Sequence, residues 1–278
     1  MNILGAKERA DTALVRRCLC QSREKAQALI MAGEVYVGVK KIRKSSDQVS
    51  TEDVLTLRQV SDQYVSRGAY KLEKAIKVFQ ADIKGHVIMD IGASTGGFTD
   101  VCLKNGANHV YAIDVGYGQL DWKLRNDPRV TVMERVNARY LTKDLFPVLP
   151  DIAVMDVSFI SVRLILPAAF EVLGPGGIMY SLIKPQFEAG KEKVGKNGVV
   201  RDPETHIDVL RSIVEFAESN SLHIRRIDYS PITGPEGNIE FLSEIVPGTG
   251  DAEIISKSEI ENIVYQAHDH LSVRGMKI

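Results

Sequence analysis

The sequence predicts an α/β fold: a mostly parallel sheet with helices on both faces, preceded by a small basic α+β module. From residue 86 onward, short apolar runs rich in β-branched residues alternate with helical periods. The first of these runs leads directly into a glycine-rich turn and a helix, and basic residues concentrate near the start of the chain. Helices that alternate with apolar strands imply a parallel sheet that is covered on both faces.

Length and composition agree with two domains. The chain has 278 residues, of which 44% are hydrophobic, so it can bury a sizeable core. We expect one domain over residues 1–62 and a second over 63–278, joined by a short link near 61–64. The net charge is −1, yet residues 1–45 hold ten Lys or Arg against four Asp or Glu. The basic surplus is therefore local to the first domain.

The first domain is predicted to contain two helices and a strand. Apolar residues at helical spacing predict a helix from about 9 to 19. Ser22 is a good N-cap for a helix over 23–32, which Gly33 ends, and a strand over 34–37 follows.

Basic side chains on these helices and after the strand can neutralise several phosphates at once. A solvated basic face is the alternative, because charge runs are often only solubilising. The candidates for binding a polyanion are Arg9, Arg16, Arg17, Arg23, Lys25, Lys40, Lys41, Arg43 and Lys44.

The second domain opens with a strand over 86–91, a glycine-rich turn over 92–98 and a helix to about 104. Gly92, Gly96 and Gly97 let the backbone approach a bulky ligand, and amides at the helix start can donate to it. The alternative is that these glycines only form a tight turn between strand and helix.

A second strand over 109–113 ends in Asp114, which can accept from both ribose hydroxyls of an adenosine cofactor. A dinucleotide fingerprint would need glycine in place of Ser94, and no partner for a pyrophosphate is evident. S-adenosylmethionine fits better, because its ribose needs an acidic side chain as partner and it has no phosphates for a protein loop to bind. Asn137 is also a candidate for the cofactor, although an ordinary turn residue is an equal alternative. The candidate cofactor-binding residues are Asp90, Gly92, Ala93, Ser94, Thr95, Gly96, Gly97, Phe98, Asp114, Asn137 and Asp156.

The alternation continues to the end of the chain. Strands are predicted over 130–133, 152–155, 178–183 and 239–246, and helices over 162–173, 204–220 and 257–271. The stretch 187–201 has three glycines among basic residues and no apolar period, so it indicates a mobile loop at an active-site mouth or a plain surface loop.

Asp156 and Lys184 each follow one of these strands, so both are expected at the carboxyl edge of the sheet, where open α/β folds do their chemistry. Taken singly, Asp156 could be a turn former and Lys184 a solvated strand end.

Five motifs in order favour a function for both residues. The motifs are 66–72 (SRGAYKL), 92–99 (GASTGGFT), 156–159 (DVSF), 182–187 (LIKPQF) and 238–240 (NIE). The set resembles the FtsJ-like ribose 2′-O-methyltransferases over nearly the whole chain, and is most similar to the TlyA branch, whose members are often labelled hemolysins. The resemblance implies a Rossmann-like methyltransferase fold with a seven-stranded sheet, S-adenosylmethionine as cofactor, and a cytidine ribose in ribosomal RNA or a ribosomal subunit as substrate.

The resemblance also implies that Lys71, Asp156, Lys184 and Glu240 form the catalytic Lys-Asp-Lys-Glu tetrad. An alcohol that attacks a sulfonium methyl must lose a proton, so a base is needed nearby. A lysine is a base only when burial and a second ammonium lower its pKa, and carboxylates then orient the pair. We expect Lys184 to be the base, Lys71 and Asp156 to tune and orient it, and Glu240 to hold Lys71 or the ribose.

The first domain resembles the S4 RNA-binding domain, from 9–11 (RAD) through 22–26 (SREKA) and 29–37 to 53–57 (DVLTL). It departs where that family usually has Asn-Gly after the first strand, since Val37-Gly38 stands there. Arg67, in the first catalytic motif, completes the candidate RNA-binding set.

The sequence predicts a cytoplasmic protein without a metal. It shows no apolar leader and no stretch long enough to span a membrane, and three cysteines give no paired or zinc-binding framework. Two alternatives remain: a hemolysin-like membrane-active protein, and an RNA-binding module whose methyltransferase half is inactive.

Overall fold

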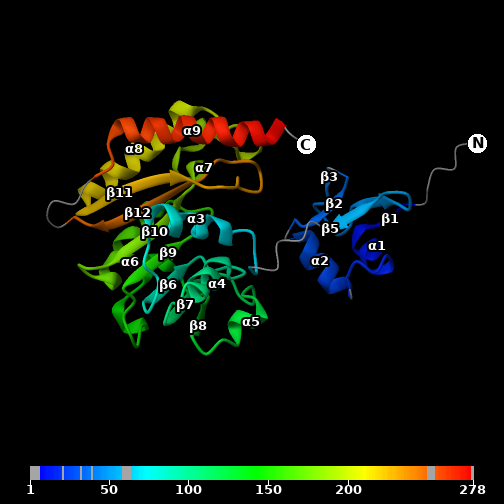
Figure 1. Cartoon of the computed structure of the whole chain (residues 1–278), viewed down its shortest axis with the longest axis horizontal. Helices are drawn as coiled ribbons and strands as arrows, with labels where there is room; N and C mark the ends of the chain where they lie inside the picture. The colour runs from blue at the N-terminus through cyan, green and yellow to red at the C-terminus, as the bar shows by residue number, and fades with distance from the viewer. Residues whose placement is uncertain are drawn as a thin grey trace, which may run out of the picture. The chain divides into compact units, whose positions relative to one another are not determined.

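The computed structural model describes residues 7–20, 22–31, 33–38, 40–57, 64–248 and 254–276. Its contacts divide the chain into two compact units, one ending at Ser66 and one starting at Arg67. Residues 61–63 lie outside the described residues, so a boundary after residue 62 stays a prediction. Figure 1 shows each unit with its own sheet and helices.

The first unit packs two helices against two small sheets. β1 pairs with β4, and β2 lies between β3 and β5, all antiparallel. Its elements are β1 (Lys7–Arg9), α1 (Ala10–Arg16), α2 (Arg23–Met31), β2 (Val35–Val37), β3 (Lys40–Lys41), β4 (Gln48–Ser50) and β5 (Leu55–Leu57). Leu14, Ile30 and Val35 are central to its buried core.

The predicted helices of this unit are present with shifted ends. Arg9 belongs to β1 and has an extended backbone, so α1 begins one residue later. The helix ends at Arg16 because Cys18 takes a left-handed φ of 56°. Ser22 caps α2 as predicted, since its Oγ accepts from the Lys25 N–H at 3.2 Å. Gly33 follows α2 with a φ of 73°, and Ala32 lies outside the described residues.

The second unit is built on one seven-stranded sheet with the order β11-β12-β10-β9-β6-β7-β8. The strands are β6 (Val87–Ile91), β7 (His109–Asp114), β8 (Val130–Glu134), β9 (Ile152–Met155), β10 (Ile178–Ile183), β11 (Leu222–Tyr229) and β12 (Phe241–Pro247). β12 alone runs opposite to the other six strands of this sheet. The predicted sheet, mostly parallel and seven-stranded, is confirmed.

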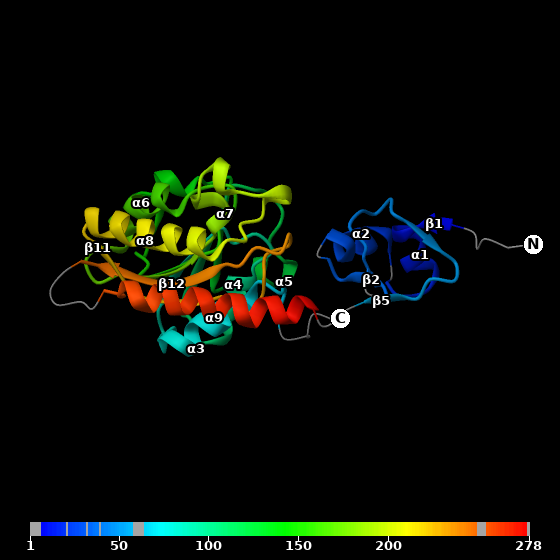
Figure 2. The same ribbon diagram turned by 90° about the horizontal axis from the view of Figure 1, so that it is seen from above.

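Helices cover both faces of this sheet. Figure 2 shows α6 and α8 on one side of the sheet and α3 on the other. Helix α3 packs on α4, and α9 packs on α8 and on the edge strand β11. The helices are α3 (Ala69–Phe79), α4 (Gly97–Lys104), α5 (Trp122–Arg125), α6 (Leu166–Leu173), α7 (Pro185–Glu188), α8 (Pro203–Ser219) and α9 (Lys257–Met276).

Several elements differ from the sequence prediction. The helix predicted over 162–173 is divided into a 3-10 turn over Val162–Leu164 and α6, which has a proline at its start. The stretch 187–201 holds the end of α7 and two 3-10 turns. Glu240 lies just before β12 rather than inside it.

Candidate active site

Four charged side chains meet at one edge of the large sheet. Asp156 follows β9 and Lys184 follows β10, so both lie at the carboxyl ends of parallel strands. Glu240 precedes β12, and because β12 is antiparallel to β10, its start lies beside the end of β10. Lys71 reaches the same place from the first turn of α3. The reversed strand β12 therefore brings Glu240 to the edge where the parallel strands end.

The four side chains form a continuous row of ion pairs. The Nζ of Lys71 is 2.6 Å from Glu240 Oε2 and 3.2 Å from Asp156 Oδ2. The Nζ of Lys184 is 2.6 Å from Asp156 Oδ1 and donates to Ser158 Oγ at 2.9 Å. The exposed side-chain fraction is 9% for each lysine, 20% for Asp156 and 2% for Glu240.

Two carboxylates and two ammonium groups balance within this buried row. Burial alone would lower the pKa of Lys71, but the carboxylates of Asp156 and Glu240 outweigh it and raise that pKa. Burial alone would raise the pKa of Asp156, but the ammonium groups of Lys71 and Lys184 hold it below its ordinary value. Lys71 therefore stays a cation, and Asp156 an anion, at neutral pH.

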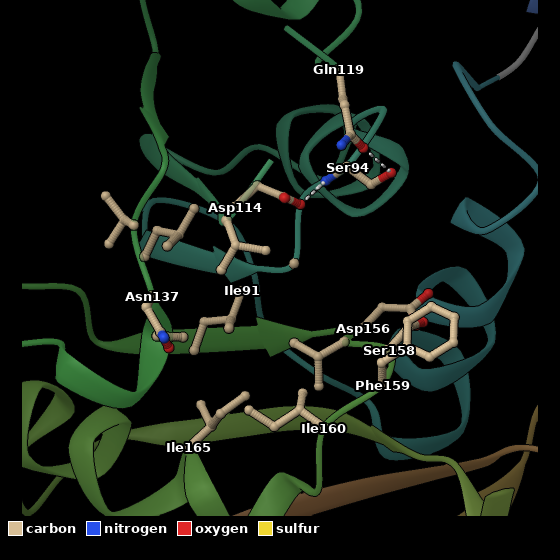
Figure 3. A pocket seen from close by; sticks show the side chains of 16 residues that line it. Ile91, Ser94, Asp114, Gln119, Asn137, Asp156, Ser158, Phe159, Ile160 and Ile165 are labelled. Atoms are coloured by element: carbon tan, nitrogen blue, oxygen red, sulfur yellow. Dashed lines mark hydrogen bonds between the residues drawn. The ribbon is translucent and has the colours of Figure 1, made fainter. Parts of the chain in front are cut away.

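A cavity of about 410 Å³ adjoins the row. Figure 3 shows Asp156, Ser158 and Phe159 together on one side, and Asp114 and Asn137 toward the other. The lining residues are Ile91, Gly92, Ser94, Ile113, Asp114, Val115, Gln119, Val136, Asn137, Ala138, Asp156, Val157, Ser158, Phe159, Ile160 and Ile165. Most of them follow the carboxyl ends of β6, β7, β8 and β9.

The glycine-rich turn shapes this cavity at Gly92. Its φ is 82°, and a Cβ at this position would stand 2.8 Å from the carbonyl oxygen of Asp156. The next turn residue in the lining, Ser94, donates its N–H to Asp114 Oδ2 at 2.8 Å, and the Gly116 N–H donates to Oδ1 at 2.6 Å. Two backbone amides thus orient the Asp114 carboxylate at the cavity wall.

Of the predicted cofactor residues, Gly92, Ser94, Asp114, Asn137 and Asp156 line the cavity. Six others are not part of the lining: Asp90, Ala93, Thr95, Gly96, Gly97 and Phe98.

Two of those six have structural roles that the sequence did not indicate. Asp90 is fully buried and accepts from Thr99 Oγ1 at 2.6 Å, which ties β6 to α4. At Gly96 a Cβ would stand 2.2 Å from Leu124, so this glycine lets the turn pack against α5 instead of approaching a ligand.

The lining also includes residues that the prediction missed. Gln119 reaches the turn through the Ser94 hydroxyl at 3.3 Å, and Val136, Ile160 and Ile165 supply apolar wall. Isolated apolar residues after a strand carry no sequence signal for a ligand site.

The cavity fits S-adenosylmethionine. Its volume lies in the range of small-molecule sites, and it is mostly apolar with few polar groups. Asp114 offers an oriented acceptor for a ribose diol, and apolar side chains such as Ile113 and Val136 suit a purine. The absence of a Cβ at Gly92 leaves room at the side nearest Asp156.

The predicted RNA-binding arginines of the first unit are partly used within it. Asp11 is fully buried and pairs with Arg9 Nη2 at 2.9 Å and Arg23 Nε at 3.0 Å. Arg17 pairs with Glu8 at 3.1 Å and donates to the Ser50 carbonyl at 2.8 Å, with only 20% of its side chain exposed. Arg17 therefore acts as a structural anchor of this unit.

The other candidates are more accessible. Arg16 also pairs with Glu8, at 2.5 Å, but its side chain is 56% exposed. Lys25, Arg43 and Lys44 are exposed, and Lys41 is half-buried. The side chain of Lys40 lies outside the described part. Arg67, in the second unit, is exposed and donates to the Thr233 carbonyl at 3.5 Å.

The single reversed strand in a seven-stranded sheet, with a cofactor-sized cavity at the carboxyl edge, defines the class of Rossmann-like methyltransferases. More particularly, the chain belongs to the FtsJ-like methyltransferase family, whose model matches residues 64–244, and an S4 domain model matches residues 8–55. S-adenosylmethionine is the cofactor that this family implies. The predicted resemblances to both families are confirmed.

Relatives match this chain over nearly their whole length. The Bacillus subtilis protein YqxC is 48% identical over 95% of both chains. The 16S/23S rRNA (cytidine-2′-O)-methyltransferase TlyA of Mycobacterium tuberculosis is 42% identical over 95% of this chain and 98% of its own. A Streptococcus thermophilus protein of known structure, labelled a hemolysin, is 42% identical, with a TM-score of 0.78 over 98% of this chain and 99% of its own.

Proposed function

We propose that this chain transfers a methyl group from S-adenosylmethionine to the ribose 2′-hydroxyl of a cytidine in ribosomal RNA. The row of Lys71, Asp156, Lys184 and Glu240 beside the cavity carries the proposal, because it places a candidate base next to a methyl donor site. The basic S4 unit and the rRNA cytidine-2′-O-methyltransferases among the relatives support RNA as substrate.

Lys184 is the proposed base. In the step, the ribose oxygen forms a bond to the methyl carbon while the carbon–sulfur bond breaks, and the hydroxyl proton passes to the neutral amine of Lys184. When bound, S-adenosylmethionine supplies the electrophilic methyl group. Ser158 Oγ and Asp156 Oδ1 hold the Lys184 nitrogen from two sides, which fixes its position relative to the cavity that Asp156 and Ser158 line.

Lys71 remains a partner of Asp156 when Lys184 is neutral. Asp156 would lose its only cation if Lys184 were its sole partner, but Lys71 also contacts it at 3.2 Å. A buried carboxylate without a partner is costly, so the second ammonium keeps Asp156 paired during the proposed proton transfer. Glu240 in turn holds Lys71 at 2.6 Å and stays buried beside it.

In this proposal Asp114 binds the ribose of the cofactor, and the apolar wall holds the adenine. Asp156 belongs both to the row and to the cavity lining, so it joins the cofactor site to the base. The S4 unit would dock on the RNA backbone, with ribosomal RNA or a ribosomal subunit in the cytoplasm as partner.

Methyl transfer to RNA tests the proposal directly. The full chain is incubated with ribosomal subunits, with naked rRNA and with methyl-labelled cofactor, and the label is mapped to base or ribose. Label on a cytidine 2′-oxygen is the expected result. Label on a base, or on no RNA, would contradict the proposal, and the second outcome would favour an inactive methyltransferase half.

The hemolysin label motivates the membrane-active alternative. Among the described residues, no helix combines the length and the apolar character needed to cross a membrane. Release of a dye from phosphatidylcholine vesicles by the purified chain would favour membrane activity. We expect none at concentrations that methylate RNA.

A further inference from the structure

Two neighbouring segments carry Asp156 and Lys184 of the proposed catalytic row. The loop after β9 holds Asp156 and Ser158, and the segment after β10 holds Lys184 and α7. Lys184 already joins the two segments, since its Nζ contacts Asp156 Oδ1 and Ser158 Oγ. These contacts are made by a flexible side chain, so they need the two backbones to be held at a fixed separation.

Glu188, the last residue of α7, makes a second connection between the same segments. Its Oε2 accepts from Ser161 Oγ at 2.7 Å, and its Oε1 accepts from the Val162 N–H at 2.8 Å. Val162 begins a 3-10 turn, where the first N–H groups have no partner within the turn. The carboxylate therefore satisfies a backbone donor as well as a hydroxyl.

The position of Glu188 is unusual for a charged side chain, because only 1% of it is exposed. Burial raises the pKa of this carboxyl, although the bonds from Ser161 and Val162 act the other way. Arg163 Nη1 is 3.5 Å away and supplies the nearest counter-charge, while its Nη2 donates to Ser212 of α8 at 2.8 Å. A buried carboxylate is retained only where its bonds offset the cost of desolvation.

The loop that Glu188 contacts needs such support. Val157, Ser158, Phe159 and Ile160 all line the cofactor cavity. Phe159 has a φ of 64° and is 91% exposed, and a left-handed backbone is unfavourable for a bulky residue. Its ring lies 5.1 Å from that of Phe187, next to Glu188, so the strained residue is also tied to α7.

We propose that Glu188 is a positioning residue: it holds the loop over 156–162, which walls the cofactor cavity, against the segment that carries Lys184. The inference rests on the proposed function, and no step of methyl transfer passes through Glu188. It predicts that cofactor affinity and the order of the loop depend on the two hydrogen bonds of the carboxylate, rather than on its charge.

Two substitutions separate hydrogen bonding from charge. In Glu188→Gln the amide oxygen can still accept from the Val162 N–H, and the amide N–H can donate to Ser161 Oγ. In Glu188→Ala both donors of the loop lose their partner. Glu244→Ala is the matched control. Glu244, in β12, is a buried carboxylate that accepts two hydrogen bonds from Arg226 in β11. It does not line the cavity.

The test measures S-adenosylhomocysteine binding by calorimetry and amide hydrogen exchange over 157–162 without ligand. We expect Glu188→Ala to weaken binding about tenfold or more and to speed exchange in this loop. Glu188→Gln should stay within about threefold of the unchanged chain. Glu244→Ala should lower the melting temperature without altering either quantity.

Unchanged binding and exchange in Glu188→Ala would overturn the proposal, and so would an equal loss in Glu188→Gln. If Glu188→Ala does not fold, Ser161→Ala removes one of the two bonds and should give a smaller loss in both quantities; no change there would overturn it too. Neither measurement uses turnover, so a chain that methylates no RNA would refute the proposed function and leave this test intact.

Discussion

At the scale of single residues, four charged side chains from different segments act together as one buried row. The motif order picks out Lys71, Asp156, Lys184 and Glu240 although they are far apart in the chain, and the structure places them in one row. The sequence could not show that Asp90 points into the core. Strand β6 is buried on both faces, and its sequence has no polar alternation. Which side chains of such a strand reach a ligand is decided by tertiary packing.

Replacing Lys184 tests the assignment of the base. We expect Lys184→Ala to slow single-turnover methyl transfer at least 100-fold, within the usual range for loss of a general base. Cofactor affinity should change little, because Lys184 does not line the cavity. Lys193→Ala is the control, since that lysine pairs with Asp208 at the surface. Turnover close to that of the control would remove Lys184 from the role of base.

Asp90 predicts a dependence of stability on pH. Burial raises its pKa to about 7, well above the value in an unfolded chain. Between about pH 4 and 7 the folded state therefore holds a proton that the unfolded state has lost, and this group lowers the free energy of unfolding by about 1.4 kcal/mol per pH unit. The contribution is complete below pH 4 and is lost as the pH rises through 7.

Asp90→Asn removes this titration while its amide oxygen can still accept from Thr99. Urea unfolding at pH 5 and pH 8 should show that the variant gains stability relative to the unchanged chain as the pH rises. The same substitution at the exposed Asp144 is the control and should give no such gain. A difference between Asp90→Asn and the unchanged chain that stays constant with pH would show that Asp90 does not titrate in this range.

At the scale of elements, the alternation of strands and helices is visible in the sequence, except where local signals conflict with packing. β11 was not predicted, because Arg225 and Arg226 interrupt its apolar pattern at a bulge on the sheet edge. α3 was not predicted either: Gly68 precedes it without a side-chain cap, and Lys71 occupies its buried face. That lysine breaks the apolar stripe because it serves the site.

The glycine-rich turn can be tested at Gly92. In Gly92→Ala the new Cβ meets the Asp156 carbonyl oxygen at 2.8 Å, at a residue with a φ of 82°. We expect a loss of about 2–4 kcal/mol in the free energy of unfolding and a clear loss of cofactor affinity, since turn and loop must move apart.

Gly85→Ala is the matched control, because Gly85 has a φ of 79° with nothing within 4 Å of its Cβ position. It carries the backbone strain without the steric contact, so it should lose only about 1 kcal/mol and keep full affinity. Thermal unfolding measures the stability of each variant, and calorimetry with S-adenosylhomocysteine measures its cofactor affinity. Equal effects at the two glycines would mean that the close approach at Gly92 is unimportant.

At the scale of the whole molecule, the chain combines two units that each have their own buried core. The second holds the proposed chemistry, and the first concentrates positive charge on a scaffold organised by Asp11. The charge surplus predicted a polyanion partner, but it could not show which arginines are engaged internally. Asp11 and Arg17 form ion pairs within this unit because of how it packs, and a count of charges in the sequence gives no information on packing.

Lys25, Arg43 and Lys44 are three of the exposed cations in the described part of this unit. Neutralising Arg43 and Lys44 together should weaken binding to rRNA and reduce the slope of log affinity against log salt by about one per lost phosphate contact. Cofactor affinity should be unchanged, and methyl transfer should recover at saturating RNA, because the second unit is intact. Filter binding from 50 to 300 mM salt, roughly the range over which phosphate contacts are lost, measures the slope.

The double variant Lys77→Ala with Lys84→Ala removes the same charge from exposed positions of the second unit, in α3 and before β6, and serves as the control. If it reduces the slope as much as the substitutions in the first unit, the effect reflects the net charge of the chain and not a site. If only the first unit responds, phosphate contacts there bring the RNA to a methyltransferase whose chemistry they do not alter.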